Sequence, residues 1–135
     1  MRNLAIAGVG LLLALGGTGV ARAQSAGAFM TNPAFSGPKP ARCDSTYEMQ
    51  HCAAHDLRVA DRAMSAAYAA ARSRSSASAR SRLLTEQRRW LRTRDSGCVA
   101  KGRRYDGGSM RPVVVAQCWV EVTRARTRAL GAWRR

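Results

Sequence analysis

The feature that most constrains the fold is a set of four cysteines, Cys43, Cys52, Cys98 and Cys118, in a chain of only 135 residues. A chain of this length forms one small domain, which excludes a two-domain enzyme, and small exported domains commonly use disulfides because their cores are thin. Zinc is the alternative, but eight residues separate the first two cysteines and nineteen the last two. Structural zinc sites use closer pairs, with about two to four intervening residues. The cysteines therefore predict two disulfides and no metal site.

The first 23 residues have the pattern of a cleavable export signal. Arg2 supplies a positive start, residues 4–15 are apolar, and the small residues Ala21 and Ala23 form a cleavage pattern before Gln24. The apolar run is shorter than the ~20 residues of a membrane span, and no later segment reaches that length. We therefore expect residues 1–23 to be a signal peptide and the mature protein to be periplasmic or secreted, with no membrane span.

Two segments of different composition follow the predicted signal peptide. Residues 24–42 contain Pro33, Pro38 and Pro40 and lack a regular apolar spacing, so we expect a disordered linker rich in proline and glycine. Residues 43–135 contain one further proline, Pro112, and no glycine before Gly97. This composition is typical of helices and predicts a helical domain over residues 43–135.

The first helix of this domain is predicted to begin at a capping box. Ser45 can accept a hydrogen bond from a free backbone amide, while Glu48 reaches back to the cap residue. Apolar and small residues then recur three, four and seven positions apart as far as Ala71, which keeps one face inward. The serine-rich run 72–78 breaks this pattern and predicts a turn.

Two more helices complete the prediction. The second covers about residues 78–96 and is expected to end at Gly97, because glycine commonly follows the last turn of a helix. A glycine-rich loop follows, and Pro112 then fits the first turn of a third helix, where a missing amide is harmless. The predicted fold class is therefore all-α, a small three-helix bundle held by two disulfides.

The spacing favours one pairing of the cysteines. Cys43 precedes the cap at Ser45, so its segment can fold back to reach Cys52, whereas two cysteines nine positions apart inside one helix would lie about 13 Å from each other, too far for a disulfide. A bond between Cys98 and Cys118 would then close the glycine-rich loop. A different hairpin register could instead bring Cys98 near Cys52, and this alternative stays open.

The order of the cysteines and the residues between them resembles a known family. The residues that carry the resemblance are Cys43, Met49, Cys52, Ala60, Asp61, Tyr68, Gln87, Arg88, Arg89, Trp90, Arg94, Asp95, Cys98, Gly107, Gly108, Ser109, Cys118, Thr123 and Arg126. Together they are similar to the LprI-type lysozyme-inhibitor N-terminal domain over about residues 43–130. The resemblance implies an exported, disulfide-bonded helical domain and an activity as a lysozyme inhibitor.

Four polar residues in this set also have a physical interpretation. Asp61, Gln87, Arg94 and Arg126 fall on or near the inward faces of the three predicted helices. We expect them to form a buried polar network that fixes the register of the helices, because arginine can bind a carboxylate at two points. The alternative is that Asp61 and Arg94 form a recognition or catalytic pair.

No other pattern predicts catalysis or a cofactor. His51 and His55 lie four positions apart beside Asp56, a spacing that can place two rings on one metal. Two solvated histidines on a polar face are the favoured explanation. Gly-x-Ser-x-Gly, phosphate-binding glycine loops and Cys-x-x-Cys are absent from the sequence. We therefore expect a protein that is not an enzyme and has no cofactor.

The charge of the chain favours a binding function. Lysine and arginine number 23 against 8 acidic residues, a net charge of +15. We expect Arg103, Arg104 and Tyr105, on the predicted loop, to contact the two carboxylates in the cleft of a lysozyme. The alternative is an arginine-rich protein that binds a polyanion, namely nucleic acid, lipopolysaccharide or an acidic wall polymer. Its candidate residues are Arg72, Arg74, Arg80, Arg82, Arg124, Arg128, Arg134 and Arg135.

Overall fold

The computed structural model describes residues 24–133, so the predicted signal peptide lies outside the described residues. Every regular element in the described range is helical. The elements are α1 (Ala26–Met30), the 3-10 turn η1 (Pro33–Phe35), α2 (Thr46–Ser73), α3 (Ala77–Gly102), the 3-10 turn η2 (Arg103–Tyr105) and α4 (Arg111–Gly131). The all-helical class is confirmed, but α1 is a helix that the sequence did not predict, so the described chain has four α-helices instead of three.

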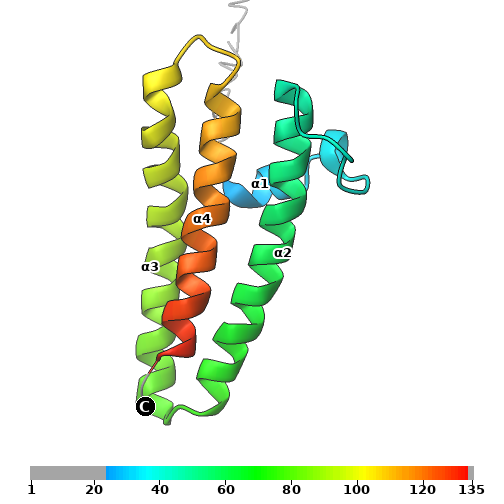
Figure 1. The fold of residues 1–135 in the computed structure, drawn as a ribbon. Helices are drawn as coiled ribbons and strands as arrows, with labels where there is room; N and C mark the ends of the chain where they lie inside the picture. Colours follow the sequence, from blue (N-terminus) through cyan, green and yellow to red (C-terminus); the bar gives the residue numbers. More distant parts are fainter. Residues whose placement is uncertain (1–23, 134–135) are drawn as a thin grey trace, which may run out of the picture.

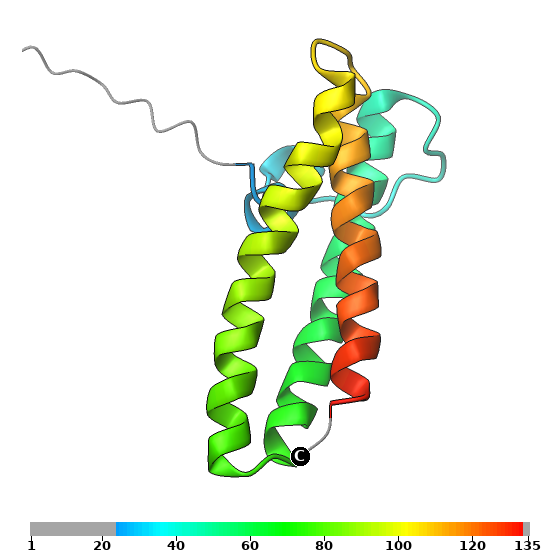
Figure 2. The same cartoon turned by 90° about the vertical axis from the view of Figure 1, so that its left-hand side faces the viewer.

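The three long helices run up and down beside one another (Figure 1). α2 and α4 point in the same direction, and α3 runs opposite to both. α4 packs most extensively on α2 and less on α3, whereas α2 and α3 have little direct contact with each other (Figure 2). α4 therefore lies at the centre of the bundle and supplies residues to every part of the core.

The capping box at the start of α2 forms as predicted. Ser45 Oγ accepts from the Glu48 backbone N–H at 3.1 Å, and Glu48 Oε2 accepts from the Ser45 backbone N–H at 2.9 Å. The predicted serine turn is also present, since α2 ends at Ser73 and Ser76 caps α3 by accepting from the Ala79 N–H. These local hydrogen bonds satisfy amides that a helix end leaves free.

The predicted end of the second helix at Gly97 is wrong, because α3 continues to Gly102. Nothing lies within 4 Å of the position that a side chain on Gly97 would take, and a glycine inside a helix costs only about 1 kcal/mol. Burial of Cys98 against α4 outweighs that cost. Gly102 lies so close to the Val115 side chain that a Cβ atom would overlap it, so this glycine allows α3 and α4 to approach.

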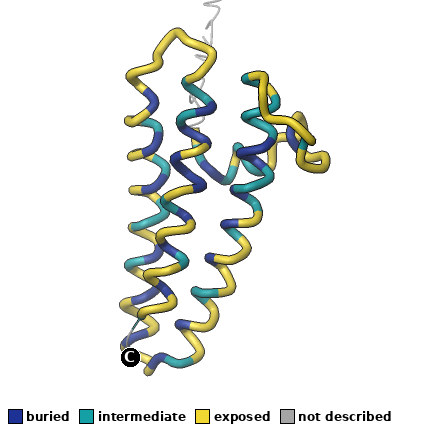
Figure 3. The backbone as a smooth tube through the Cα atoms, viewed as in Figure 1, coloured by how far each residue is buried: buried dark blue, intermediate teal, exposed yellow. Residues whose placement is uncertain are grey.

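The core has two parts, one at each end of the bundle. Buried positions recur along each long helix, and the connection between α3 and α4 is exposed throughout (Figure 3). The part near that connection contains Ala26, Ala53, Leu57, Cys98, Val115, Ala116, Cys118, Trp119 and Val120. The other part contains Met64, Ala71, Leu83 and Leu130, with Trp90 and Trp133 partly buried against them. Small residues dominate the first part, which also contains the disulfide between Cys98 and Cys118.

The disorder expected for residues 24–42 is corrected by the structure. Ala26 is fully buried, and the Phe29 ring lies 5.7 Å from Trp119 and 5.4 Å from Phe35. The Ala26 N–H also donates to Asp95 Oδ1 at 3.3 Å. The prolines fix the backbone of this segment without preventing burial of Phe35 and partial burial of Phe29. Residues 24–35 are called the N-terminal arm below.

Candidate functional site

Two disulfides cross-link the described chain. Cys43 and Cys52 are bonded with their Cα atoms 6.2 Å apart, and Cys98 and Cys118 with theirs 5.6 Å apart. This is the pairing that the spacing favoured. The first bond ties the segment before α2 to the second turn of that helix. The second joins α3, about one turn before its end, to α4, about two turns after its start, so these parts of the two helices cannot separate.

The buried arginines are bonded into two adjacent groups. Arg126 Nε donates to Gln87 Oε1 at 2.8 Å, and its Nη1 donates to Glu86 Oε1 at 2.7 Å. Gln87 Nε2 lies 3.5 Å from the sulfur of Met64 on α2. The structure thus brings Gln87 and Arg126 together, and Glu86 is a partner that sequence reasoning missed. The available signal was that Glu86 is the neighbour of Gln87, which lies on the inward face of its helix.

Arg94 forms the second group. Its Nε donates to Asp95 Oδ1 at 3.0 Å, and its Nη1 lies 3.5 Å from both Asp61 Oδ1 and Thr123 Oγ1. Asp95 Oδ1 also accepts from the N-terminal arm, as described above. Arg94 therefore links all three long helices, and through Asp95 it links them to the arm. The structure thus shows Asp61 and Arg94 in contact, and their role in fixing the register of the helices stays a prediction.

Trp90 connects the two groups. The guanidinium carbons of Arg94 and Arg126 lie 5.3 and 5.7 Å from the centre of its ring. A cation at this distance from a tryptophan ring is attracted to the ring face. The side chains of both arginines are almost fully buried. The network thus buries positive charge between an aromatic ring and partly exposed carboxylates.

The exposed connection between α3 and α4 carries the predicted contact residues. Arg103, Arg104 and Tyr105 form the turn η2, and Tyr105 is 46% exposed. Asp106 lies 2.6 Å from Arg111 Nε as an ion pair without hydrogen-bond geometry. No acidic side chain of the described residues pairs with Arg103 or Arg104. These two guanidinium groups are therefore available to an external anion.

Backbone contacts fix the shape of the connection. The Asp106 N–H donates to the Arg103 carbonyl at 3.1 Å, and the Gly108 N–H donates to the Tyr105 carbonyl at 3.0 Å. Gly107 has φ +79°, a conformation that residues with a side chain rarely adopt. The connection is thus a series of tight turns. It presents the Arg103, Arg104 and Tyr105 side chains at one end of the bundle.

The histidines do not form a metal site with their neighbours. His51 packs near Phe35 and Tyr47, and its Nε2 lies 3.3 Å from the Gly37 carbonyl. Partial burial raises the pKa of Asp56, but hydrogen bonds from Lys39 and His55 outweigh this effect, so its pKa lies below 3.8. Within the described range, no group of three or more histidine, cysteine, aspartate or glutamate residues could hold a metal.

The arginine cluster near the turn between α2 and α3 serves partly to cap helices. Arg74 Nη2 donates to the Leu130 carbonyl at 2.6 Å, and Arg80 Nε donates to the Arg72 and Ser75 carbonyls at 3.0 Å. These contacts satisfy carbonyls at the ends of α4 and α2. Two of the candidate arginines for a polyanion are thereby engaged within the protein. Arg134 and Arg135 lie outside the described residues.

These features define a small helical protein with two disulfides and a basic, exposed connection at one end. None of the described helices has the length and apolar character to cross a membrane. The chain belongs to the LprI lysozyme inhibitor family, because the model of that family, described as lysozyme inhibitor LprI, matches residues 38–130. The family and the disulfides indicate an extracytoplasmic protein, and the family is one of inhibitors, not of enzymes.

A curated relative adds little about function. An uncharacterized protein of Rhizobium meliloti (strain 1021) is 46% identical over 44 residues. The match covers 33% of this chain and 32% of the relative, so it spans about a third of each protein. No solved structure matches the chain.

Proposed function

We propose that this protein is an exported inhibitor of a lysozyme and that it contacts the enzyme through Arg103, Arg104 and Tyr105. The family supports the inhibitor activity. The observation that carries the choice of surface is the exposed pair of arginines on η2 without an acidic partner among the described residues. Seven of the eight acidic residues contact a basic side chain or a helix cap, and none of them pairs with Arg103 or Arg104.

The chemistry of the connection suits a carboxylate-lined cleft. A lysozyme cleft contains two carboxylates, and the planar guanidinium group of arginine can bind a carboxylate at two points. Tyr105 adds an aromatic side chain, a residue type that is common among the residues that contribute most to binding. The connection projects beyond the ends of α3 and α4, so its side chains can reach into a concave surface (Figure 2).

Rigidity of the connection supports the proposal further. The Cys98–Cys118 disulfide and the close contact of Gly102 with Val115 fix the ends of α3 and α4. A segment that already has its bound shape loses less conformational entropy on binding, and this increases affinity. Fixing the connection also offsets the like-charge repulsion between this basic protein and a basic lysozyme, a repulsion that slows association.

The proposal is tested by measuring lysis of cell walls by several types of lysozyme in the presence of the protein. We expect inhibition of at least one type that persists at physiological salt, because contacts buried in a cleft are screened less than surface contacts. The double variant R103A/R104A and the variant Y105A should each raise the concentration needed for half inhibition about tenfold or more.

The matched control is the double variant R88A/R92A on the exposed face of α3, which removes the same charge from a different surface. It should inhibit as the parent does. An equal loss in both double variants would show that net charge, not the connection, drives binding. Inhibition of no lysozyme, together with binding to heparin or DNA that weakens steeply with salt, would favour the polyanion alternative.

A further inference from the structure

The helix α3 carries more positive charge than either of the other long helices. It has seven basic and two acidic side chains, a net charge of +5, whereas α2 has three of each and α4 has four basic and one acidic. The two acidic side chains of α3 bind buried arginines, since Glu86 pairs with Arg126 and Asp95 with Arg94. The exposed arginines of α3 therefore have no carboxylate of their own helix to neutralise them.

Four exposed arginines lie on the side of α3 that is turned away from α4. α3 packs on α4 and only slightly on α2, and exposed positions recur along its outer side (Figure 3). The four residues, none of which forms an ion pair with a described residue, are Arg82, Arg88, Arg89 and Arg92. At 3.6 residues per turn they fall within about a third of the helix circumference and extend over about 15 Å. They are called the α3 arginine row below.

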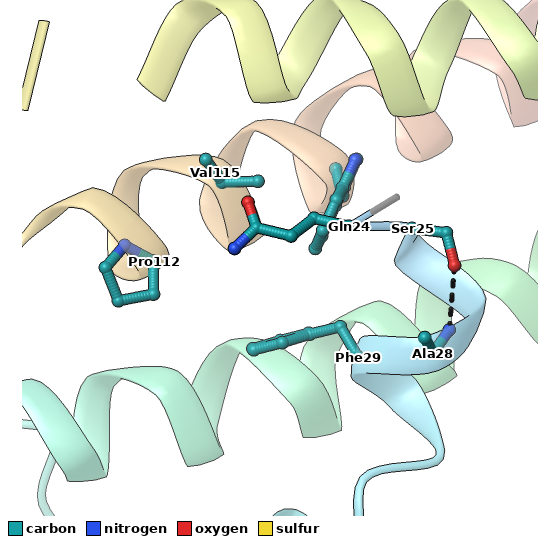
Figure 4. A pocket seen from close by; sticks show the side chains of 7 residues that line it. Gln24, Ser25, Ala28, Phe29, Pro112 and Val115 are labelled. Atoms are coloured by element: carbon teal, nitrogen blue, oxygen red, sulfur yellow. Dashed lines mark hydrogen bonds between the residues drawn. The ribbon is translucent and has the colours of Figure 1, made fainter. Parts of the chain in front are cut away.

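The row borders a shallow polar hollow on the surface of α3. The residues that line it are Ser81, Arg82, Thr85, Glu86 and Arg89. Arginine and threonine side chains commonly bind the oxygens of phosphate groups. The apolar cavity between the N-terminal arm and α4, in contrast, has no charged residue in its lining (Figure 4). Of these two hollows, only the one on α3 indicates the charge of a ligand, which is negative.

The composition of this surface narrows the kind of partner. Helices that lie on a membrane insert an apolar face, but the apolar face of α3, which includes Leu83, is buried in the core. The centre of a protein interface is usually apolar or aromatic, but among the described residues of α3 the only exposed large apolar side chain is Leu84. A row of positive charges suits a linear partner with repeated negative charges. We propose that the α3 arginine row binds a linear phosphodiester polymer.

Each guanidinium group of the row can donate two hydrogen bonds to the oxygens of one phosphate. Neutralising the phosphates releases the cations bound to the polymer, so the affinity falls steeply as the salt concentration rises. This mode of binding recognises the phosphodiester chain and not the unit that it joins. A nucleic acid and a polymer of glycerol phosphate share that chain.

This surface is separate from the proposed lysozyme contact. Arg92 lies ten residues before the end of α3, about 15 Å from the connection that carries Arg103 and Arg104. Of the arginines that the sequence suggested for a polyanion, only Arg82 belongs to the α3 arginine row. Failure of either proposal leaves the other intact.

The test is a titration of a fluorescent single-stranded oligothymidylate with the exported, purified protein at several salt concentrations, followed by anisotropy. We expect a dissociation constant on the order of 10⁻⁵ M at low salt. The logarithm of the binding constant should fall with the logarithm of the salt concentration with a slope of about −3, because each of four phosphate contacts on a single strand contributes about 0.7. Unlabelled poly(glycerol phosphate) should displace the oligothymidylate, which would show that the phosphodiester chain is recognised.

Two double variants that remove the same charge locate the binding surface. R88A/R92A should weaken binding of the oligothymidylate about tenfold or more at low salt and reduce the slope by about 1.4, while it retains inhibition of lysozyme. R103A/R104A should bind the oligothymidylate with the slope of the parent. Both pairs of residues are exposed, and thermal melts of both variants check that they fold.

Four outcomes would overturn the proposal. They are a dissociation constant above about 1 mM at low salt, a slope that R88A/R92A leaves unchanged, an equal loss in R88A/R92A and R103A/R104A, and no displacement by poly(glycerol phosphate). Tighter binding to polyglutamate would assign the row to carboxylates, and tighter binding to phosphatidylglycerol vesicles would assign it to a membrane. Either result would also overturn it.

Discussion

Replacing Arg94 with alanine should destabilise the protein more than any comparable change on its surface. The Arg94 side chain is 5% exposed, and its guanidinium group contacts Asp95 at 3.0 Å and both Asp61 and Thr123 at 3.5 Å. It also lies over the Trp90 ring. Alanine removes all of these contacts and leaves two carboxylates without their cation.

The magnitude follows from the exposure of those carboxylates. Removing one partner of a buried ion pair costs about 3–5 kcal/mol. Asp61 and Asp95 have side chains that are 30% and 27% exposed, so water can replace part of the lost interaction, and we expect the lower end, ~3 kcal/mol. For a domain of this size such a loss lowers Tm by on the order of 10 °C.

The assay is a thermal melt of the oxidised protein followed by circular dichroism. The control is Arg92→Ala, two residues earlier on α3, where the side chain is exposed and makes no ion pair with a described residue. Changes at such positions usually alter the free energy of unfolding by less than about 0.5 kcal/mol. If the two variants melted at the same temperature, the buried network would contribute nothing to stability and its assigned role would be wrong.

Three further measurements test other parts of the structure. Gly102→Ala should lower the free energy of unfolding by about 1–3 kcal/mol, because its Cβ atom would overlap Val115. Gly97→Ala should raise it by up to about 1 kcal/mol, because this position is in a helix interior with free space around it. Thermal melts that rank the two variants in the reverse order would contradict the packing of α3 on α4. The Ser45 backbone N–H and hydroxyl hold the pKa of Glu48 below its ordinary value of 4.5. The capping box therefore adds stability at neutral pH that is lost as the pH falls below about 4.5. Glu48→Gln should make stability less dependent on pH in this range. An unchanged pH dependence would contradict the contribution of the Glu48 carboxylate. Mass spectrometry of the unreduced protein should find two disulfides and no free thiol in the described chain. A cysteine that reacts with an alkylating reagent would contradict the two disulfides.

Local sequence signals predicted the parts of the fold that depend on neighbouring residues. The capping box at Ser45, the serine turn and the helix start at Pro112 follow from hydrogen bonds and backbone angles within a few positions. The spacing also favoured the observed pairing of the cysteines, because Cys43 precedes the helix that contains Cys52, but it left a bond between Cys52 and Cys98 open. The end of α3 was missed because the reason it continues beyond Gly97 lies in contacts with α4.

The residues of the polar network could be proposed from the sequence, but their contacts with one another could not. Spacing placed Asp61, Gln87, Arg94 and Arg126 on inward faces, but it could not distribute them between two groups or bring in Asp95. Which carboxylate pairs with which arginine depends on the rotation and approach of helices that are far apart in the sequence.

The N-terminal arm shows most clearly what tertiary structure alone decided. By composition, its prolines and irregular spacing predict disorder, and its two phenylalanines have no periodic pattern that indicates a buried face. The arm is ordered because Ala26 and Phe29 cover Trp119 and its neighbours in the core. That apolar surface exists only after α2, α3 and α4 have packed. The sequence by itself predicted the three long helices and favoured the observed pairing of the cysteines, whereas tertiary packing decided where α3 ends and where the arm binds.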